Sequence, residues 1–364
     1  MIQKKGLSLM AKTIISICCF LAVFVTMVIV VSVKKGAYDL AVSDIIVSLE
    51  PGAYLSHNTF AFFFEACGET PIYLLAGLSM AILVWFFHKC CKFRPWNEIL
   101  SVIAGCLVIL AFWFYFKTIV GYVMDHVVGF GWKECTGVYD ITKSDVLTLT
   151  LLEFAMAIVA AICLVFALKN VKEETLKKLA KWVLAFVIAA AIGAALIEII
   201  KRPMGRMRYR TMNFLGDTEH TGFTAWYVKN GKRYGDDIYK YMADTHDMYK
   251  SFPSGHTNAA GTTYALMMLP AVLGIKKKGI KVICWVAPII YTGLVAVARI
   301  VAGAHYFSDV LFGGTISFLC EMLTYEAIIC KFKHFKCFKK GYVDPDEAVE
   351  SSEVVVLEQD ADKM

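Results

Sequence analysis

Charged residues are scarce in this chain. Only 19% of its 364 residues are Asp, Glu, Lys or Arg, while 58% are hydrophobic. Soluble domains carry about 25% charged residues and a smaller apolar share. Runs of about 20 apolar residues, the length that crosses a bilayer, recur along the chain, and we count eight of them. This composition excludes an ordinary soluble enzyme and predicts a polytopic membrane protein.

Cysteine pairs with zinc-binding spacing are also missing. The chain has 12 cysteines, but no two of them are separated by two residues, so a zinc site is disfavoured. Most of the cysteines lie inside apolar runs, where the side chain behaves as a small hydrophobic group. Cys67 and Cys135 fall in segments that we expect on the same, outer side of the membrane, and a disulfide between them is left open.

The first apolar run lacks a signal-peptide cleavage site. This run, Thr13 to Val33, follows Lys4, Lys5 and Lys12 as a signal peptide would. It is longer than the apolar core of a typical signal peptide, so we expect a retained membrane anchor. The chain also lacks internal repeats and Gly/Ser-rich linkers, and nothing in it marks a second, soluble domain.

The fold class predicted from the apolar runs is all-α, a polytopic membrane bundle of about eight transmembrane helices. Between the first two spans, the mildly amphipathic stretch Leu40 to Leu49 can lie flat on the membrane. The expected spans are Thr13 to Val33, Pro71 to Phe87, Ile99 to Val120, Leu147 to Leu168, Trp182 to Ile200, Thr257 to Ile275, Val282 to Val301 and Val310 to Cys330.

Basic residues in the short loops set the expected orientation. Lysines and arginines cluster in 4–12, 89–94, 169–181, 276–281 and 331–340, which all fall on one side of an eight-span topology. By the positive-inside rule that side is cytoplasmic, so we expect both termini inside the cell. The tail after Gly341 is acidic and is expected to be disordered.

One outer segment, 201–256, violates the positive-inside rule. Five basic residues crowd its first ten positions, and they are Lys201, Arg202, Arg206, Arg208 and Arg210. A local exception to a general trend invites a functional explanation, here an anion site. The alternative is a basic patch that touches lipid headgroups.

Three polar clusters lie at outer ends of predicted spans. The first runs from Lys201 to Arg208 after the fifth span, and the second, Phe252-Pro253-Ser254-Gly255-His256-Thr257, opens the sixth. The third, Arg299 to Asp309, joins the seventh span to the eighth. Because three consecutive helix ends face the same side, the clusters can converge on one pocket.

The residue types in these clusters suit a phosphate group. Phosphoryl transfer spreads negative charge over three oxygens, so a site needs several fixed donors around one point. Lys201, Arg208 and Arg299 supply cations. Ser254 and the amide of Gly255 lie where a helix is expected to begin, and helix starts favour anions. These five residues are the predicted phosphate-binding set.

Two histidines, His305 and His256, can take separate catalytic roles, one as the nucleophile and the other as the proton donor and acceptor. His305 and Asp309 are four residues apart, so on a helix they share a face, and the carboxylate can orient the imidazole. His305 would attack phosphorus and form a phosphohistidine. His256 would protonate the leaving oxygen and then activate water. With charge neutralised by arginine and lysine, we expect neither a metal nor another cofactor.

The combined pattern resembles the type 2 phosphatidic acid phosphatase superfamily. That family has Lys, six residues, Arg-Pro; then Pro-Ser-Gly-His; then Ser-Arg, five residues, His, three residues, Asp. The spacings fit Lys201 and Arg208, Pro253 to His256, and Arg299, His305 and Asp309. The chain departs at Tyr209, where the family has Pro, and at Ala298, where it has Ser. Neither departure removes a charge or a proton carrier.

The resemblance implies a domain layout. Residues 98–330 would form the six-span catalytic core, 1–97 would add two N-terminal spans and an outer loop, and 331–364 would be a cytoplasmic tail. In the family the site faces outward at the membrane surface, which agrees with the orientation expected from loop charge.

Three functions stay open at this point. The first is a metal-independent phosphatase for a phosphorylated lipid of the phosphatidic acid, phosphatidylglycerol phosphate or polyprenyl diphosphate type. A lipid phosphotransferase would share the phosphohistidine, and a membrane anion or lipid transporter would use the basic edge as a gate. Expected partners are the lipid substrate and membrane lipids, with neither nucleic acid nor an obligate protein partner.

Overall fold

The computed structural model describes residues 9–48, 58–133, 140–230 and 247–333, and these residues form helices and no strand. Seven segments within them are long and apolar enough to cross a membrane. They are Thr13–Ile46, Thr59–Cys90, Trp96–Val127, Lys143–Ala167, Glu173–Phe214, Lys278–Val301 and Phe307–Ile328. The predicted all-helical membrane bundle is therefore confirmed. Cys135 and the acidic tail lie outside the described residues, whereas Cys67 is a free thiol.

The predicted span from Thr257 to Ile275 has a composite structure. It consists of α9 (Gly255–Gly261), the 3-10 helix η3 (Thr262–Met268) and α10 (Leu269–Leu273), which follow one another without a break. A 3-10 segment inside a helix is tighter than its neighbours and often marks a functional position. This composite segment is not among the seven long helices, and it packs against α7, α11 and α12.

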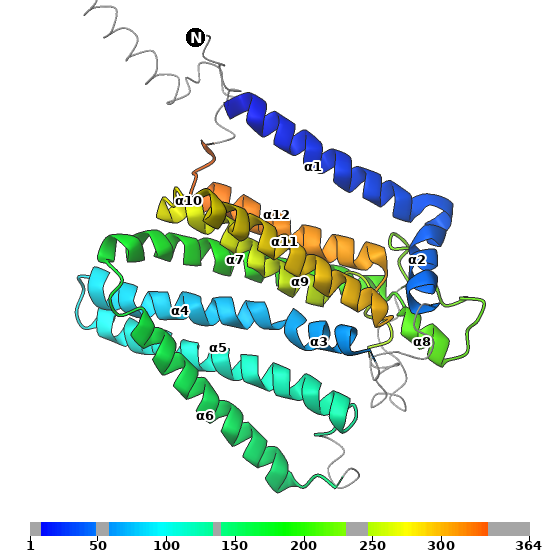
Figure 1. The fold of residues 1–364 in the computed structure, drawn as a ribbon, viewed down its shortest axis with the longest axis horizontal. Coiled ribbons are helices and arrows are strands. Elements are labelled where there is room, and N and C mark those ends of the chain that lie inside the picture. The colour runs from blue at the N-terminus through cyan, green and yellow to red at the C-terminus, as the bar shows by residue number, and fades with distance from the viewer. Residues whose placement is uncertain (1–8, 49–57, 134–139, 231–246, 334–364) are drawn as a thin grey trace, which may run out of the picture.

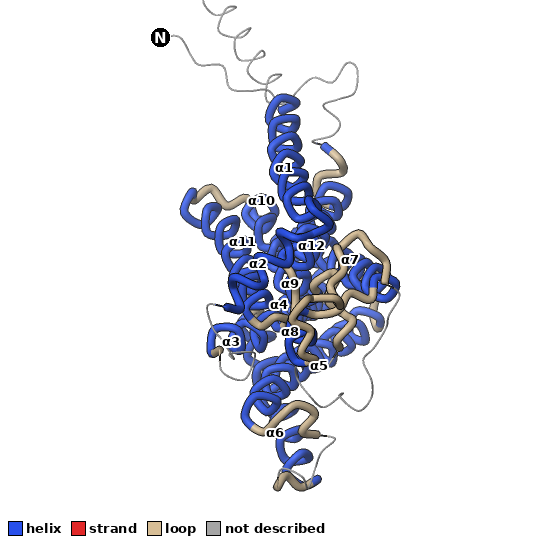
Figure 2. Tube along the Cα trace, turned by 90° about the vertical axis from the view of Figure 1, so that its right-hand side faces the viewer, coloured by secondary structure: helices blue, strands red, loops and turns tan. Residues whose placement is uncertain are grey.

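The helices run side by side, and their ends gather at two ends of the bundle (Figures 1 and 2). The main helices are α4 (Thr70–Cys90), α5 (Trp96–Val127), α6 (Lys143–Ala167), α7 (Glu173–Met204), α11 (Lys278–Val301) and α12 (Phe307–Ile328). The basic turns between α4 and α5, between α6 and α7, and between α10 and α11 lie at one end. The short helices α2 (Ala37–Ser48) and α8 (Tyr209–Phe214) lie at the other.

The first helix, α1 (Leu9–Ser32), lies along the outside of α12. Phe20 stacks on Phe318 with ring centroids 5.5 Å apart, and Phe24 meets Phe312 at 5.7 Å. The 3-10 turn η1 (Val33–Gly36) then redirects the chain into α2, which packs against α11 and α12. The stretch predicted to lie flat on the membrane is thus largely helical, and it is docked on the ends of two core helices.

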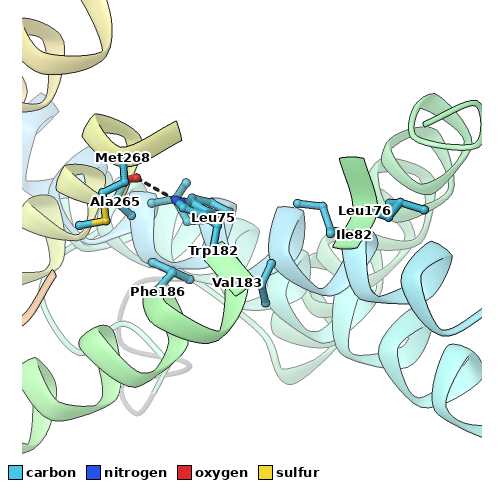
Figure 3. Packing of buried hydrophobic residues seen from close by; sticks show 8 residues of the cluster. All are labelled: Leu75, Ile82, Leu176, Trp182, Val183, Phe186, Ala265 and Met268. Carbon is cyan, nitrogen blue, oxygen red and sulfur yellow. Dashed lines mark hydrogen bonds between the residues drawn. The ribbon is translucent and has the colours of Figure 1, made fainter. Parts of the chain in front are cut away.

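A buried cluster joins α4, α7 and the composite segment (Figure 3). Trp182 and Phe186 of α7 pack there with Leu75 of α4 and Ala265 of η3. The indole N–H of Trp182 donates to the carbonyl of Ala265 at 2.8 Å, so its polar group is satisfied in an apolar setting. This cluster fixes the height of the composite segment relative to α7, and hence the place where α9 begins.

Large apolar side chains cover the outside of the bundle. Leu151, Val159 and Ile162 on α6 and Ile283 and Ile290 on α11 are more than half exposed. Exposed apolar surface on this scale is costly in water but suits contact with lipid tails. The lipid-facing surface and the buried cluster together explain why the runs are apolar all round.

A close approach between α12 and the start of α9 sets the geometry at this end of the bundle. A Cβ added to Gly313 of α12 would collide with the carbonyl oxygen of Ser254, whereas one added to the neighbouring Gly314 would meet nothing closer than 3.5 Å. Backbone cannot move aside as a flexible side chain can, so glycine is required at the first position and not at the second.

We expect Gly313→Ala to lower the free energy of unfolding by about 1–3 kcal/mol, the usual cost of overpacking. Gly314→Ala is the matched control, because it adds the same methyl group one residue away. It should be neutral or stabilising by up to about 1 kcal/mol through helix propensity. Thermal unfolding of the two purified variants in detergent would check this, and equal midpoints would contradict it.

Candidate active site

Six of the eight predicted site residues line one pocket of about 790 Å³ at the end of the bundle where α2 and α8 lie. They are Lys201, Arg208, Gly255, His256, Arg299 and His305. The pocket also takes residues from α5, from α3 (Thr59–Gly68) and from the loop before α9. The two predicted residues that do not line it are Ser254 and Asp309.

His305 lies in the turn between α11 and α12 and is buried. Its Nδ1 is 2.6 Å from the carbonyl oxygen of Ser251. A carbonyl can only accept, so Nδ1 carries the proton and Nε2 keeps its lone pair. Burial, reinforced by the positive charges of Arg208, Arg299 and Lys201, holds the pKa of His305 well below its usual value. The imidazole is therefore neutral and able to act as a nucleophile.

The role predicted for Asp309 needs correction. Its carboxylate oxygen is 3.6 Å from Nδ1 of His305, beyond hydrogen-bond range. It accepts instead from the hydroxyl of Ser251 at 2.5 Å and from the amide of Tyr306 at 2.8 Å. The direct partner of His305 is the Ser251 carbonyl, because the folded turn brings that carbonyl closer to the ring than the carboxylate four residues away. Asp309 orients the histidine only through Ser251.

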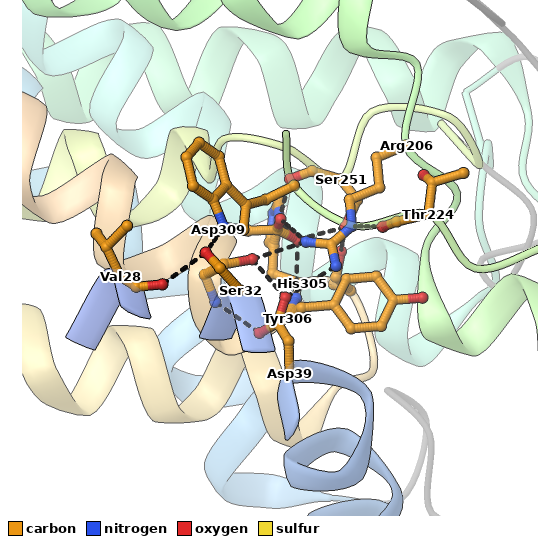
Figure 4. Close-up of polar contacts among 12 residues, drawn as sticks. Val28, Ser32, Asp39, Arg206, Thr224, Ser251, His305, Tyr306 and Asp309 are labelled. Carbon is orange, nitrogen blue, oxygen red and sulfur yellow. Dashed lines mark hydrogen bonds and ion pairs between the residues drawn. The ribbon is translucent and has the colours of Figure 1, made fainter. Parts of the chain in front are cut away.

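Arg206 lies behind Asp309 in a fully buried ion-pair network (Figure 4). Its Nη1 is 2.6 Å from Asp309 and donates to the hydroxyl of Ser308 at 2.8 Å. Its Nη2 donates to Asp39 at 2.8 Å, and its Nε donates to the carbonyl of Thr224 at 2.7 Å. One guanidinium thus joins two buried carboxylates.

Aromatic rings close the rest of the space around this guanidinium. The ring centre of Tyr306 is 4.0 Å from the central carbon of Arg206, and that of Phe223 is 5.1 Å away. A cation stacked on aromatic faces is favourable when it is shielded from water. The position is therefore built for arginine, whose planar fork makes several bonds at once.

His256 is held by two side chains from outside the predicted clusters. The hydroxyl of Tyr122 is 2.8 Å from Nε2, and Glu69 lies 3.4 Å from Nδ1. Burial, followed by the charge of Arg299, holds the pKa of His256 well below its usual value. His256 is neutral in this state of the pocket, with a carboxylate ready to stabilise its protonated form.

Cations face the pocket from three elements. Arg299 of α11 pairs with Glu65 at 2.6 Å, and Nζ of Lys201 lies against Gly255, where an added Cβ would be 3.4 Å away. The Nε atoms of Arg208 and Arg299 are buried without a hydrogen-bond partner among the described residues. Buried guanidinium donors left open toward a cavity suit an anionic ligand.

Ser254 has a structural place in this pocket. It is the N-cap of α9, and its hydroxyl accepts from the amide of Thr257 at 3.3 Å. It is fully buried and does not line the cavity, which corrects its predicted contact with phosphate. The hydroxyl is used by the helix because the first amides of a helix need acceptors. Gly255, one residue later, does face the cavity.

Five residues of the site escaped sequence reasoning, and they are Asp39, Glu65, Glu69, Tyr122 and Ser251. The four charged or phenolic ones come from outside the three clusters, and Ser251 acts through its backbone, which no side-chain pattern reveals. Arg206 was visible as one of five crowded basic residues, but only its buried contacts separate it from the exposed Arg202.

We expect Arg206→Met to lower the free energy of unfolding by about 3–5 kcal/mol, because it leaves two buried carboxylates without their cation. Arg202→Met is the matched control. Arg202 is three-quarters exposed and 3.8 Å from Glu198, and exposed pairs contribute at most about 1 kcal/mol. Thermal unfolding in detergent measures both. Equal losses would show that the buried network does not stabilise the fold.

Residues 182–330 match the family model described as the PAP2 superfamily. No curated protein and no solved structure matches the chain. All eight residues predicted for the site fall inside the matched segment, whereas Asp39, Glu65, Glu69 and Tyr122 lie before it. The chain is therefore a polytopic helical membrane protein that carries a PAP2 superfamily domain over residues 182–330, and this domain indicates phosphatase-type activity.

Proposed function

We propose that this protein is a metal-independent phosphatase that removes phosphate from a phosphorylated lipid through a phosphohistidine at the outer membrane face. The observation that carries the proposal is the pairing of a neutral, oriented His305 with two buried guanidinium groups that keep open donors. A nucleophile and an anion-binding set around one cavity are what phosphoryl transfer requires.

In the first step Nε2 of His305 forms a bond to phosphorus as the bond from phosphorus to the leaving oxygen breaks. Arg208, Arg299 and Lys201 offset the charge that spreads over the three equatorial oxygens. The proton stays on Nδ1, which donates to the Ser251 carbonyl, and this hydrogen bond stabilises the positive charge that develops on the ring.

His256 supplies the proton that the leaving oxygen needs. Burial and the cations around the pocket keep His256 neutral when no substrate is bound, and a phosphate dianion offsets those cations and favours proton uptake. Glu69, 3.4 Å from Nδ1, stabilises the charged ring. In the second step neutral His256 accepts a proton from water, which attacks phosphorus and releases phosphate and His305.

A lipid substrate is supported by the place of the pocket at the ends of apolar helices. The wall of α5 runs from Phe114 through Thr118 and Tyr122 to His126, about three turns of helix. A chain can stay in the bilayer while its headgroup reaches the cations. The outward orientation is supported by the basic turns at the opposite end of the bundle.

We expect His305→Gln and His256→Gln to reduce phosphate release at least about 100-fold, since each removes a group with its own chemical step. His88→Gln is the matched control, because His88 lies at the end of α4 beside Glu98 and away from the pocket. Phosphate release from phosphatidic acid, phosphatidylglycerol phosphate and polyprenyl diphosphate in mixed micelles measures the effect, with EDTA inert and vanadate inhibitory.

Full activity of folded His305→Gln protein would overturn the mechanism. Anion flux into liposomes that survives this substitution, with no phosphate released, would favour a transporter. Transfer of the phosphoryl group to an added alcohol in preference to water would favour a phosphotransferase, which is read from the products.

Glu65 offers a further test, because its carboxylate is paired with the guanidinium of Arg299, which would hold the phosphate. We expect Glu65→Gln to bind inorganic phosphate and vanadate about tenfold more tightly, since a competing negative charge is removed from the pocket. Glu198→Gln is the control, as Glu198 also lines the pocket but pairs with Arg202. Inhibition constants measure the change, and an unchanged constant would show that Arg299 does not meet the anion.

A further inference from the structure

We propose that Asp39, in the N-terminal segment outside the PAP2-matched residues, is a positioning residue that holds the nucleophile His305 through Arg206, Asp309 and Ser251. The inference rests on the proposed function, because it assigns a role in the same reaction. It also gives the N-terminal helices α1 and α2 a place in catalysis.

Asp39 is fully buried, and its carboxylate contacts Arg206 and Ser308, which both lie within the PAP2-matched residues. One carboxylate oxygen accepts from the amide of Ser308 at 2.8 Å. The other accepts from the Ser308 hydroxyl and from Nη2 of Arg206 at 2.8 Å. Ser308 stands at the start of α12, directly before Asp309. A carboxylate from α2 therefore binds both the first turn of α12 and the arginine behind it.

A continuous chain of short contacts runs from Asp39 to the nucleophile (Figure 4). Arg206 links Asp39 to Asp309, with distances of 2.8 and 2.6 Å. Asp309 accepts from the hydroxyl of Ser251, and the carbonyl of Ser251 accepts from His305 at 2.6 Å. Each link is buried, so water cannot replace a partner that is lost.

Because Asp39 pairs with Arg206, the guanidinium is shared between two carboxylates, those of Asp39 and Asp309. Without the charge of Asp39, Arg206 would have Asp309 as its remaining carboxylate and could turn both Nη atoms toward it. Asp309 would then be drawn away from the Ser251 hydroxyl, and the carbonyl that fixes the tautomer of His305 would lose its support. The expected consequence is a misoriented nucleophile in an intact pocket.

The connection between α1 and α2 shows that α2 is held in this place against local preference. Lys34 and Lys35 both have positive φ values, 51° and 58°, a conformation that residues with a Cβ rarely adopt and that tertiary contacts must maintain. Gly36 follows with φ 85° and packs so closely on Phe223 that an added Cβ would be 3.3 Å from its ring. On the α1 side, the Trp226 indole donates to Ser32 at 3.0 Å.

The charge of Asp39 also gives a signature in the pH profile. The groups that face His305 from the surrounding elements are Lys201, Arg208, Arg299, His256 and Asp309. Removing a negative charge behind Asp309 leaves this set more positive, which disfavours the imidazolium. The acid limb of kcat/KM should therefore move to lower pH. A general loss of packing would leave the limb in place.

The test compares Asp39→Asn with Asp44→Asn in the full-length protein, with p-nitrophenyl phosphate and phosphatidic acid as substrates. Asp44 is on the same helix and accepts from the hydroxyl of Tyr209 at 2.7 Å, so its substitution removes a contact of α2 that does not lead to His305. We expect Asp39→Asn to lower kcat about tenfold or more with KM within about twofold, and to shift the acid limb downward. Asp44→Asn should leave both unchanged.

Unchanged kcat and pH profile in folded Asp39→Asn protein would overturn the inference, as would an equal loss in Asp44→Asn. If Asp39→Asn does not fold, Ser308→Ala carries the test, because it removes one hydrogen bond from Asp39 and one from Arg206, and no charge. A severalfold drop in kcat at an unchanged unfolding midpoint supports the inference, and full kcat overturns it. Wild-type protein that releases no phosphate from any substrate would instead refute the proposed function.

Discussion

The ion pairing of one buried arginine with two buried carboxylates is the constraint on which the pocket end of this structure depends. Arg206 is 1% exposed and brings together α2, the loop before α9 and the start of α12. A charge so far from water is tolerated only when each donor finds an acceptor, and here its three nitrogens all do. The arrangement therefore permits little variation in where Asp309 and Ser251 can lie, and His305 takes its orientation from them.

The same end of the bundle carries several cations, and they add to the effect of burial on the protonation state of the two histidines. Arg208, Arg299 and Lys201 lower the pKa of both imidazoles, together with burial. A nucleophile gains from this, because the neutral ring keeps its lone pair. A proton donor does not, so His256 needs the negative charge of a bound phosphate and of Glu69 before it can act. In the proposed mechanism, the protonation of His256 is therefore coupled to the binding of phosphate.

The fold and the pocket-lining residues could be predicted from the sequence where residue spacing alone carries the information. Apolar runs gave the helical membrane fold, and basic loops marked one end of the bundle. The spacings within the three clusters identified six residues that line one pocket. The predictions failed where one side chain can bind either of two partners. Ser254 could face a phosphate or cap a helix, and Asp309 could bind His305 or Arg206. Such choices depend on distances of a few tenths of an ångström, set by packing elsewhere, as at Gly313.

The boundary of the family match also separates two kinds of information in the chain. Residues 182–330 hold every group that the proposed chemistry uses directly. The groups that tune them, Asp39, Glu65, Glu69 and Tyr122, come from earlier helices that the match does not cover. Chemistry constrains the first set tightly, because phosphorus needs a nucleophile, a proton donor and cations at one point. Within the second set, Glu65, Glu69 and Tyr122 line the pocket, whereas Asp39 lies behind it in the buried network of Arg206. In the proposed mechanism the reacting groups therefore come from residues 182–330, and the earlier helices supply the side chains that pair with them or hold them in place.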